Sequence, residues 1–278
     1  MTVATDVREA APPATPAAAA RGPVVCHCRD LTVELGSSEG PRRVLEGITA
    51  DLREGELVSI LGRSGTGKTT LLRVLGGLVD PAPGSQVGFR GQPLDGPPEE
   101  AAFVFQDYTA SLLPWRTVEK NVALGLEGKA SKGEIRRRVA DALETVGLAE
   151  RARDYPWRLS GGMQQRVQLA RGLAMDARVL LMDEPFGALD AMTKASLQDE
   201  LQRVHQQRKP TIAFVTHDVD EAVYLSDRIL VLGGSPATIV RDIPVELPRP
   251  RDQLATKELP QFHRLRRIVF DEIRAHHG

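Results

Sequence analysis

The chain lacks any long apolar segment and any excess of charge of one sign. No uninterrupted apolar stretch approaches the roughly 18 residues that a membrane-spanning helix needs. Among the 278 residues, 36 Lys and Arg stand against 37 Asp and Glu, so the formal net charge is -1. This balance gives no general basic field of the kind that attracts nucleic acid. We therefore expect one α/β domain with a smaller insertion, and no nucleic-acid partner.

Cysteine is also scarce. Cys26 and Cys28 flank His27, which suggests a metal, yet no other cysteine is present to complete a zinc site of the usual kind. Residues two apart in a strand point to the same face, so we predict that both thiols lie on one face of a strand. Reduced thiols are typical of cytosolic proteins.

The first 23 residues lack the large apolar side chains that could offset the entropy cost of ordering the chain. They include the Ala/Pro stretch from Ala11 to Pro16, which is followed by four alanines. A secretory signal would need a basic start and a sustained apolar region, whereas Asp6, Arg8 and Glu9 come first. We predict a disordered tail over residues 1–23.

A glycine-rich segment follows the apolar run from Leu57 to Leu61 and opens a helical stretch from Thr69 to Leu75. It fits the loop whose backbone N–H groups cradle phosphates, with Lys68 reaching the terminal phosphates and Thr69 offering a hydroxyl to Mg²⁺. The strand–loop–helix context that this motif requires is present. The predicted nucleotide-binding residues of this loop are Gly62, Arg63, Ser64, Gly65, Thr66, Gly67, Lys68, Thr69 and Thr70.

Two further apolar runs end in side chains suited to phosphate hydrolysis. Val179 to Met182 is followed by Asp183 and Glu184, and Thr211 to Val215 leads to His217. The carboxyl ends of parallel strands are where α/β sheets bind ligands. Asp183 can hold Mg²⁺ through water, and Glu184 can take a proton from an attacking water. An imidazole at the same edge can contact a terminal phosphate.

In chain order, these motifs resemble those of the ATP-binding cassette (ABC) family, the ATPase subunits of ABC transporters, over about residues 24–245. Gln106 resembles the Q-loop glutamine, Leu159 to Arg166 the signature, and Ala188 to Asp190 the D-loop. The resemblance implies an α/β, ABC-type P-loop NTPase core with a mostly parallel sheet, an antiparallel β subdomain and an α-helical subdomain inserted at about 107–165. It also implies ATP and Mg²⁺ as cofactors. The implied catalytic residues are Glu184, His217, Lys68 and Gln106, and the implied metal contacts are Thr69, Gln106 and Asp183.

The signature duplicates a function that the phosphate loop already performs. Ser160, Gly161 and Gly162 offer a hydroxyl and two unhindered backbone amides just ahead of a helix that we expect to begin near Met163, which makes an anion site. In the family, two cassettes pair head to tail, and the signature of one closes over ATP held by the other. A second ATPase subunit is therefore implied, with Asp190 communicating across the interface. The implied cofactor contacts from this half are Ser160, Gly161, Gly162, Gln164 and Asp190.

The resemblance also implies membrane partners. The pore would come from membrane-spanning permease subunits, and the complex would include a periplasmic or lipid-anchored solute-binding protein. The chain itself would then be a peripheral protein on the cytoplasmic face of the cell membrane.

The segment between Gln106 and Ser160 breaks the strand pattern and reads as helical. Ser131 and Glu134 have the spacing of a capping box, and Gly147 follows as a stop signal. Apolar residues recur at helical intervals between them, at Ile135, Val139, Ala142, Leu143 and Val146.

The run from Leu112 to Trp115 is a candidate docking surface for a permease, because it places apolar side chains on a loop. In the alternative, Trp115 packs inside its own subdomain. The same run with Arg116 to Val118 is similar to the ATPases of importers for nitrate, aliphatic sulfonates and taurine. The Pro/Arg-rich stretch from Ile243 to Arg251 is similar to that group's ending. So is the amphipathic helix that we expect in the extension over residues 246–278, with Phe262, Leu265, Val269 and Ile273 on its apolar face.

The implied function is an ATP-hydrolysing motor for import of a small anion, with aliphatic sulfonates favoured and nitrate, taurine or another small solute as alternatives. A soluble ABC ATPase acting on ribosomes or DNA is the alternative from another class. Such a protein would need two cassettes in one chain or a long coiled-coil insertion, and this sequence contains neither.

Aromatic residues are also few, and none precedes Phe89. The ABC family usually places an aromatic ring shortly before the phosphate loop, where it stacks on adenine. The matching position here is Leu35. We therefore expect base recognition to rest on apolar contact from Leu35 and Val44.

Overall fold

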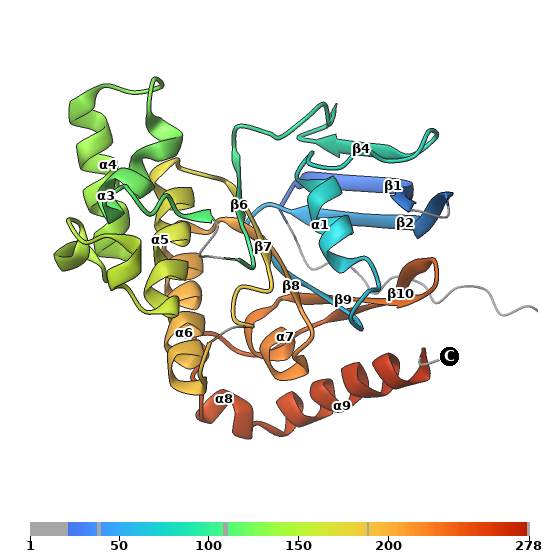
Figure 1. Ribbon diagram of the computed structural model, residues 1–278. Helices are drawn as coiled ribbons and strands as arrows, with labels where there is room; N and C mark the ends of the chain where they lie inside the picture. Colours follow the sequence, from blue (N-terminus) through green and yellow to red (C-terminus); the bar gives the residue numbers. More distant parts are fainter. Residues whose placement is uncertain (1–21, 38–39, 108–110, 188, 277–278) are drawn as a thin grey trace, which may run out of the picture.

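The computed structural model describes residues 22–37, 40–107, 111–187 and 189–276. The tail predicted over residues 1–23 lies outside the described residues except for its last two. Ten strands form one sheet in the order β5-β4-β1-β2-β10-β9-β3-β8-β7-β6 (Figure 1). The strands are β1 (Val24–Ser37), β2 (Gly40–Arg53), β3 (Leu57–Leu61), β4 (Gln86–Phe89), β5 (Gln92–Pro93), β6 (Ala101–Val104), β7 (Val179–Asp183), β8 (Thr211–Thr216), β9 (Arg228–Gly234) and β10 (Ala237–Pro244). The helices are α1 (Lys68–Leu75), α3 (Val118–Val122), α4 (Lys132–Thr145), α5 (Gly161–Ala174), α6 (Ala191–Arg208), α7 (Val219–Leu225), α8 (Ala255–Glu258) and α9 (Pro260–Ala275), with short 3₁₀ turns η1 (Ala123–Leu126), η2 (Ala149–Arg151) and η3 (Pro156–Arg158).

One half of the sheet is parallel, as the apolar runs predict. β3 pairs with β8 and β9, and β7 pairs with β8 and β6, all in parallel register. Every residue of β3, β7 and β8 is buried. Strands covered on both faces need apolar side chains throughout, which explains why these segments show no alternation. Their carboxyl ends lie at one edge, where the phosphate loop, Glu184 and His217 follow.

The other half is antiparallel. β1 pairs with β2 along most of its length and with β4 on its other side. This half is hydrogen-bonded into the same sheet through β10, which pairs antiparallel with β9 and, where Ala237 lies opposite Leu45, in parallel with β2. The predicted antiparallel part is thus present as an extension of the parallel sheet.

The two cysteines lie on one buried face of β1, as predicted. Cys26 and Cys28 are 2% and 0% exposed, whereas His27 between them is half-buried. Burial raises the pKa of Cys26 to about 12 and that of Cys28 to about 11. Both thiols are therefore unreactive near neutral pH.

The helical part lies at one side of the molecule, where α3, α4 and α5 pack together (Figure 1). Ser131 caps α4 by accepting a hydrogen bond from the Glu134 amide at 3.3 Å, and the helix ends before Gly147, which has a φ of 68°. Both signals were predicted from the sequence. The apolar residues at helical spacing pack into the core, with Val139, Ala142, Leu143 and Val146 buried and Ile135 partly buried.

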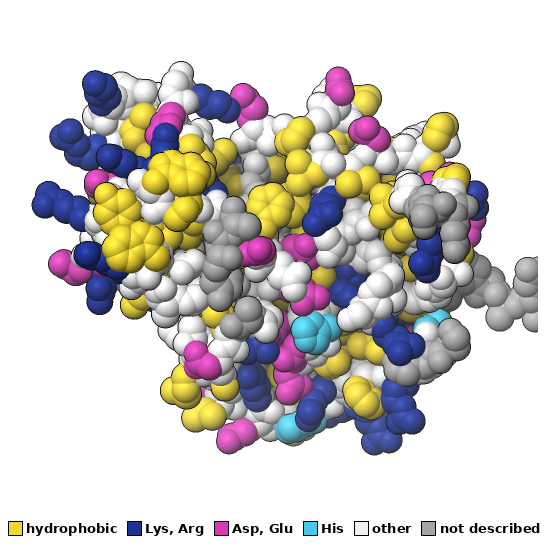
Figure 2. All heavy atoms as spheres, viewed as in Figure 1, with side chains coloured by type: hydrophobic (Ala, Val, Ile, Leu, Met, Phe, Trp, Pro, Cys, Tyr) yellow, Lys and Arg dark blue, Asp and Glu magenta, His cyan; other side chains and the backbone are white. Residues whose placement is uncertain are grey.

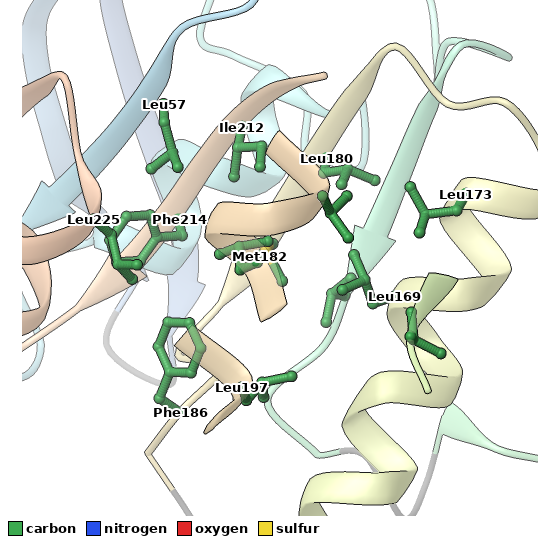
Figure 3. Close-up of a cluster of buried hydrophobic side chains, with 14 of the residues drawn as sticks. Leu57, Leu169, Leu173, Leu180, Met182, Phe186, Leu197, Ile212, Phe214 and Leu225 are labelled. Carbon is green, nitrogen blue, oxygen red and sulfur yellow. The ribbon is translucent and has the colours of Figure 1, made fainter. Parts of the chain in front are cut away.

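The main core lies between the parallel strands and the helices α5, α6 and α7. Figure 3 shows Leu180 and Met182 from β7 and Ile212 and Phe214 from β8 among side chains from these helices. Phe186, in the turn that follows β7, packs edge-on against Phe214 with ring centroids 6.3 Å apart. This packing holds the ends of β7 and β8, and therefore the side chains that follow them, in fixed positions.

The C-terminal helix is amphipathic, as predicted. In α9, Phe262 and Val269 are buried, and Leu265 and Ile273 are partly buried against the same core. The helix runs beneath α7 and β10 in Figure 1 and contacts α7, β9 and β10. Among the described residues, none of the helices combines the length and the hydropathy needed to cross a bilayer.

Candidate functional site

The glycine-rich loop joins β3 to α1 and lines a hollow of about 440 Å³. Gly65 and Gly67 have φ angles of 81° and 82°, which L side chains rarely adopt. A Cβ atom on Gly67 would also lie 2.8 Å from side-chain carbons of Val44 and Leu45. Glycine is therefore required here both by backbone conformation and by space. The loop has the shape of a phosphate cradle at a helix N-terminus.

Lys68 is the first residue of α1, and its chain turns back over the loop. It is only 5% exposed, and its Nζ donates to the Arg63 carbonyl at 2.7 Å. Burial lowers the pKa of this ammonium, although the nearby Glu184 and Asp183 oppose the shift. A buried cation at the phosphate loop is arranged to meet an anion.

The Thr69 hydroxyl and the Asp183 carboxylate lie side by side, where their oxygens could both be ligands of a cation. Thr69 Oγ1 donates to Asp183 Oδ1 at 2.8 Å, which joins the start of α1 to the end of β7. Burial raises the pKa of Asp183, and the Thr69 hydrogen bond opposes this rise. Among the described residues, no group of three His, Cys, Asp or Glu side chains could hold a metal ion. A Mg²⁺ ion would fit this site because it usually takes one or two protein oxygens and completes its shell with water and phosphate.

Glu184 lies at the centre of the residues that the sequence predicts to be catalytic. Its Oε2 lies 3.4 Å from Gln106 Nε2 and 3.3 Å from His217 Nδ1. The structure thus brings together three residues that the sequence predicted as catalytic from three separate segments. Its backbone has a φ of 43°, and its N–H donates to the Val215 carbonyl at 3.1 Å. A left-handed glutamate is uncommon, and this turn directs its carboxylate into the hollow, which it lines.

Lys194 was not identified from the sequence. Its Nζ lies 2.9 Å from Asp218 Oδ2 and 2.5 Å from Glu221 Oε1, so it ties the first turn of α6 to the turn after His217. Glu221 in turn accepts from the buried Thr216 hydroxyl at 2.5 Å. Burial lowers the pKa of Lys194, but its hydrogen bonds to Glu221 and Asp218 outweigh this and raise it. No local sequence pattern predicts the ion pairs of Lys194, because its partners are more than 20 residues away in the chain.

Replacing Lys194 with Met should destabilise the fold, because it leaves the 5% exposed Glu221 without its cation. We expect a loss of about 1–3 kcal/mol in the free energy of unfolding. The matched control is Lys129→Met, whose ion pair with Glu99 is exposed and should contribute less than about 1 kcal/mol. Urea denaturation of both variants measures the difference, and equal losses would show that the Lys194 contacts contribute no more than a surface pair.

The signature lies away from this hollow. Ser160 is the N-cap of α5, which begins at Gly161 rather than near Met163 as the sequence suggested, and its hydroxyl accepts from the Met163 amide at 3.4 Å. Gly162 packs so closely that a Cβ atom would lie 2.2 Å from Thr193 Cγ2. None of the described residues of the signature or the D-loop lines the hollow. The chain alone therefore does not join the signature to its own phosphate loop.

Two of the residues predicted in this second half act within their own chain. Gln164 Nε2 donates to the carbonyls of Pro156 and Leu159 at 3.1 and 3.2 Å, which fixes the turn before Ser160. Asp190 is the N-cap of α6 and accepts from the amides of the next turn at 3.1 Å. Their contacts with a nucleotide stay predictions.

The far end of the hollow is lined by the β1–β2 hairpin. Leu35, which is 39% exposed, and Val44 both face it, as expected for the base contact. Arg42 and Arg43 line the same end, and the sequence analysis did not identify either. Arg42 and Arg43 line the hollow because β2 pairs with β1, and no local sequence pattern indicates this pairing.

Comparisons with known proteins agree with this geometry. A family model described as ABC transporter matches residues 45–187. The chain is 47% identical over 222 residues to the aliphatic sulfonates import ATP-binding protein SsuB 1 of Xanthomonas axonopodis pv. citri, covering 79% of this chain and 87% of the relative. It is 43% identical over 244 residues to the nitrate transport protein NasD of Klebsiella oxytoca, covering 86% and 92%. Among solved structures, a dimeric post-hydrolysis state of the ATP-binding cassette MJ0796 bound to ADP and Pi matches with a TM-score of 0.69 and 30% identity, covering 80% of this chain and 99% of that one.

Proposed function

Because the chain belongs to the ABC transporter family and is an ATPase subunit of it, we propose that it drives the import of a small anion, with aliphatic sulfonates favoured over nitrate or taurine. The observation that carries the ATPase part is the convergence of Gln106, Glu184 and His217 beside the phosphate loop. The solute rests on the relatives alone, since their names include sulfonate import and nitrate transport.

In the proposed reaction, ATP lies in the hollow with its phosphates on the loop from Gly62 to Thr70. Mg²⁺, when bound, would neutralise charge on the phosphates, held by Thr69 and Asp183 with Gln106 nearby. Glu184 accepts the proton of the attacking water, and Lys68 holds the terminal phosphates. His217, whose Nδ1 lies 3.3 Å from Glu184 Oε2, is placed to contact the terminal phosphate.

We propose that the working unit contains two ATPase subunits, most simply two copies of this chain. Support comes from the separation of the signature from the hollow, because Ser160 and the α5 N-terminus present an anion site with no phosphate loop of their own. The related cassette MJ0796 is dimeric in its solved post-hydrolysis state. In such a pair, each signature would close over the nucleotide of the other subunit.

The proposed membrane contact lies on the helical part. Leu112 is buried in the core, so not every residue of the predicted docking run from Leu112 to Trp115 is available to a partner. Trp115, however, is 72% exposed, which contradicts the alternative that it packs inside its subdomain. Trp157 is 64% exposed and stacks on Tyr155. Figure 2 shows hydrophobic side chains gathered over the helical part, among Lys and Arg side chains.

A second feature of the helical part supports docking there. A hollow of about 400 Å³ between α3, α4 and η2 has an apolar floor that includes Ile135, Val139 and Leu143 and a charged rim that includes Lys120 and Glu144. An apolar floor with a polar rim fits an inserted helix from a partner. We propose that a cytoplasmic helix of the permease docks on this side, which places the chain at the cytoplasmic face of the membrane.

Reconstitution with permease and solute-binding protein in liposomes tests the proposed function. We expect ATP-dependent uptake of a labelled aliphatic sulfonate that excess nitrate or taurine does not compete away. Uptake that only nitrate or taurine abolishes would reassign the solute. An ATPase that never associates with a permease would contradict the transport proposal itself.

Trp115→Ala tests the docking surface in the same system. Loss of an exposed aromatic anchor at an interface centre costs about 2 kcal/mol, so the affinity for the permease should fall roughly 30-fold. The control is Leu254→Ala, since Leu254 is similarly exposed at 75% but lies outside the helical part. Equal affinities of the two variants for the permease would place docking elsewhere.

A further inference from the structure

The part of the hollow lined by the β1–β2 hairpin lacks the aromatic side chain expected to stack on the base, but it contains an arginine. Leu35 occupies the position where an aromatic side chain was expected, and it lies directly opposite Arg42 in the β1–β2 ladder. Residues opposite each other in an antiparallel pair share one face of the sheet. Both line the hollow. Leu35 and Arg42 therefore form one surface at the end away from Glu184.

Arg42 and its neighbour Arg43 differ in what holds them. Arg43 forms ion pairs with Glu34 at 3.3 Å and, more closely, with Glu46. The side chain of Arg42 forms no hydrogen bond or ion pair with any residue that the structure describes. An exposed guanidinium without a partner is free to take a planar partner from solution. The guanidinium of Arg43, in contrast, is already paired with the carboxylates of Glu34 and Glu46.

We propose that Arg42 supplies the stacking surface for the nucleotide base, with Leu35 beside it, in place of the missing aromatic ring. This rests on the proposed ATP site. A guanidinium is planar and weakly hydrated, so it stacks on flat π systems, as Arg does on unpaired nucleic-acid bases. An ammonium lacks that plane. The other use of an arginine here, as a charge that attracts phosphates, makes different predictions.

Equilibrium titration of isolated protein with ATP and with base-free inorganic tripolyphosphate separates the two uses. Arg42→Ala should weaken ATP binding about 3- to 10-fold and leave tripolyphosphate binding within twofold. Arg42→Lys should behave like Arg42→Ala, because it keeps the charge and loses the plane. Arg42→Trp should retain or tighten ATP binding. Since stacking is tolerant of base identity, GTP should weaken with ATP in Arg42→Ala.

Arg43→Ala is the matched control, because it removes the adjacent arginine of the same hollow. Its ATP affinity should stay within twofold of the unsubstituted chain. The proposal is overturned if Arg42→Ala binds ATP normally, if tripolyphosphate weakens as much as ATP, if Arg42→Lys restores affinity, or if Arg43→Ala has an equal effect. Failure of the ATP site itself would look different, since the unsubstituted chain would then bind neither ATP nor tripolyphosphate.

Discussion

Replacing Glu184 with Gln should nearly abolish ATP hydrolysis while leaving ATP binding intact. Gln keeps the size of the side chain and can still accept from Gln106, but it cannot take a proton from water. Removal of a general base costs about 10²–10⁴ in rate, or roughly 3–5 kcal/mol of barrier. Phosphate release under saturating ATP measures the effect, and nucleotide titration measures the affinity.

Two controls frame this result. Lys68→Ala should lose nucleotide affinity itself, since it removes the buried cation over the phosphate loop. Glu99→Gln changes a surface carboxylate, 88% exposed, and should hydrolyse ATP at the unsubstituted rate. If the Glu184→Gln protein also turned over at that rate, Glu184 would not be the base. A second expected outcome is accumulation of an ATP-bound dimer.

Replacing Ser160 with Arg should stop hydrolysis without preventing ATP from reaching the phosphate loop. Ser160, in the signature, caps α5, and in the proposed composite site an Arg there would fill the space of the partner's phosphates. The expected loss of turnover is at least about 10²-fold, as for a transition-state contact. Loss of the cap alone should cost about 1 kcal/mol of stability.

Ser131→Arg is the control for that stability cost, because Ser131 caps α4 by the same kind of hydrogen bond. It should lower the unfolding free energy by a similar amount and leave turnover unchanged. A mixture of Ser160→Arg and Lys68→Ala proteins should regain part of the activity if one intact composite site suffices. Equal losses of turnover in Ser160→Arg and Ser131→Arg would reduce the effect to stability.

The sequence predicted the parts of this fold that local chemistry determines. β3, β7 and β8 are continuous apolar runs because both of their faces are covered, and the ends of α4 follow from Ser131 and Gly147. The phosphate loop, Glu184 and His217 each directly follow one of these apolar strands. The meeting of Gln106, Glu184 and His217 could be predicted because parallel strands end at one edge of a sheet.

Other features depend on contacts between distant segments. The left-handed φ of Glu184 and the tie from Lys194 to Glu221 arise from tertiary packing, and no local pattern encodes them. The run at Leu112 shows the same limit, because hydrophobicity alone did not tell the buried Leu112 from the exposed Trp115. Arg42 could be noticed only when the strand pairing placed it opposite Leu35.

The most direct test of the composite ATP site is a crosslink between two different chains. One carries Ser64→Cys in the phosphate loop, the other Ser160→Cys in the signature, and both carry Glu184→Gln. The native thiols will not interfere, because burial raises their pKa to about 12 and about 11. With a short bismaleimide and Mg²⁺-ATP, we predict a product of two chains that forms only in the mixture and only with nucleotide. No such product, with both engineered thiols shown to be reactive, would contradict the composite site.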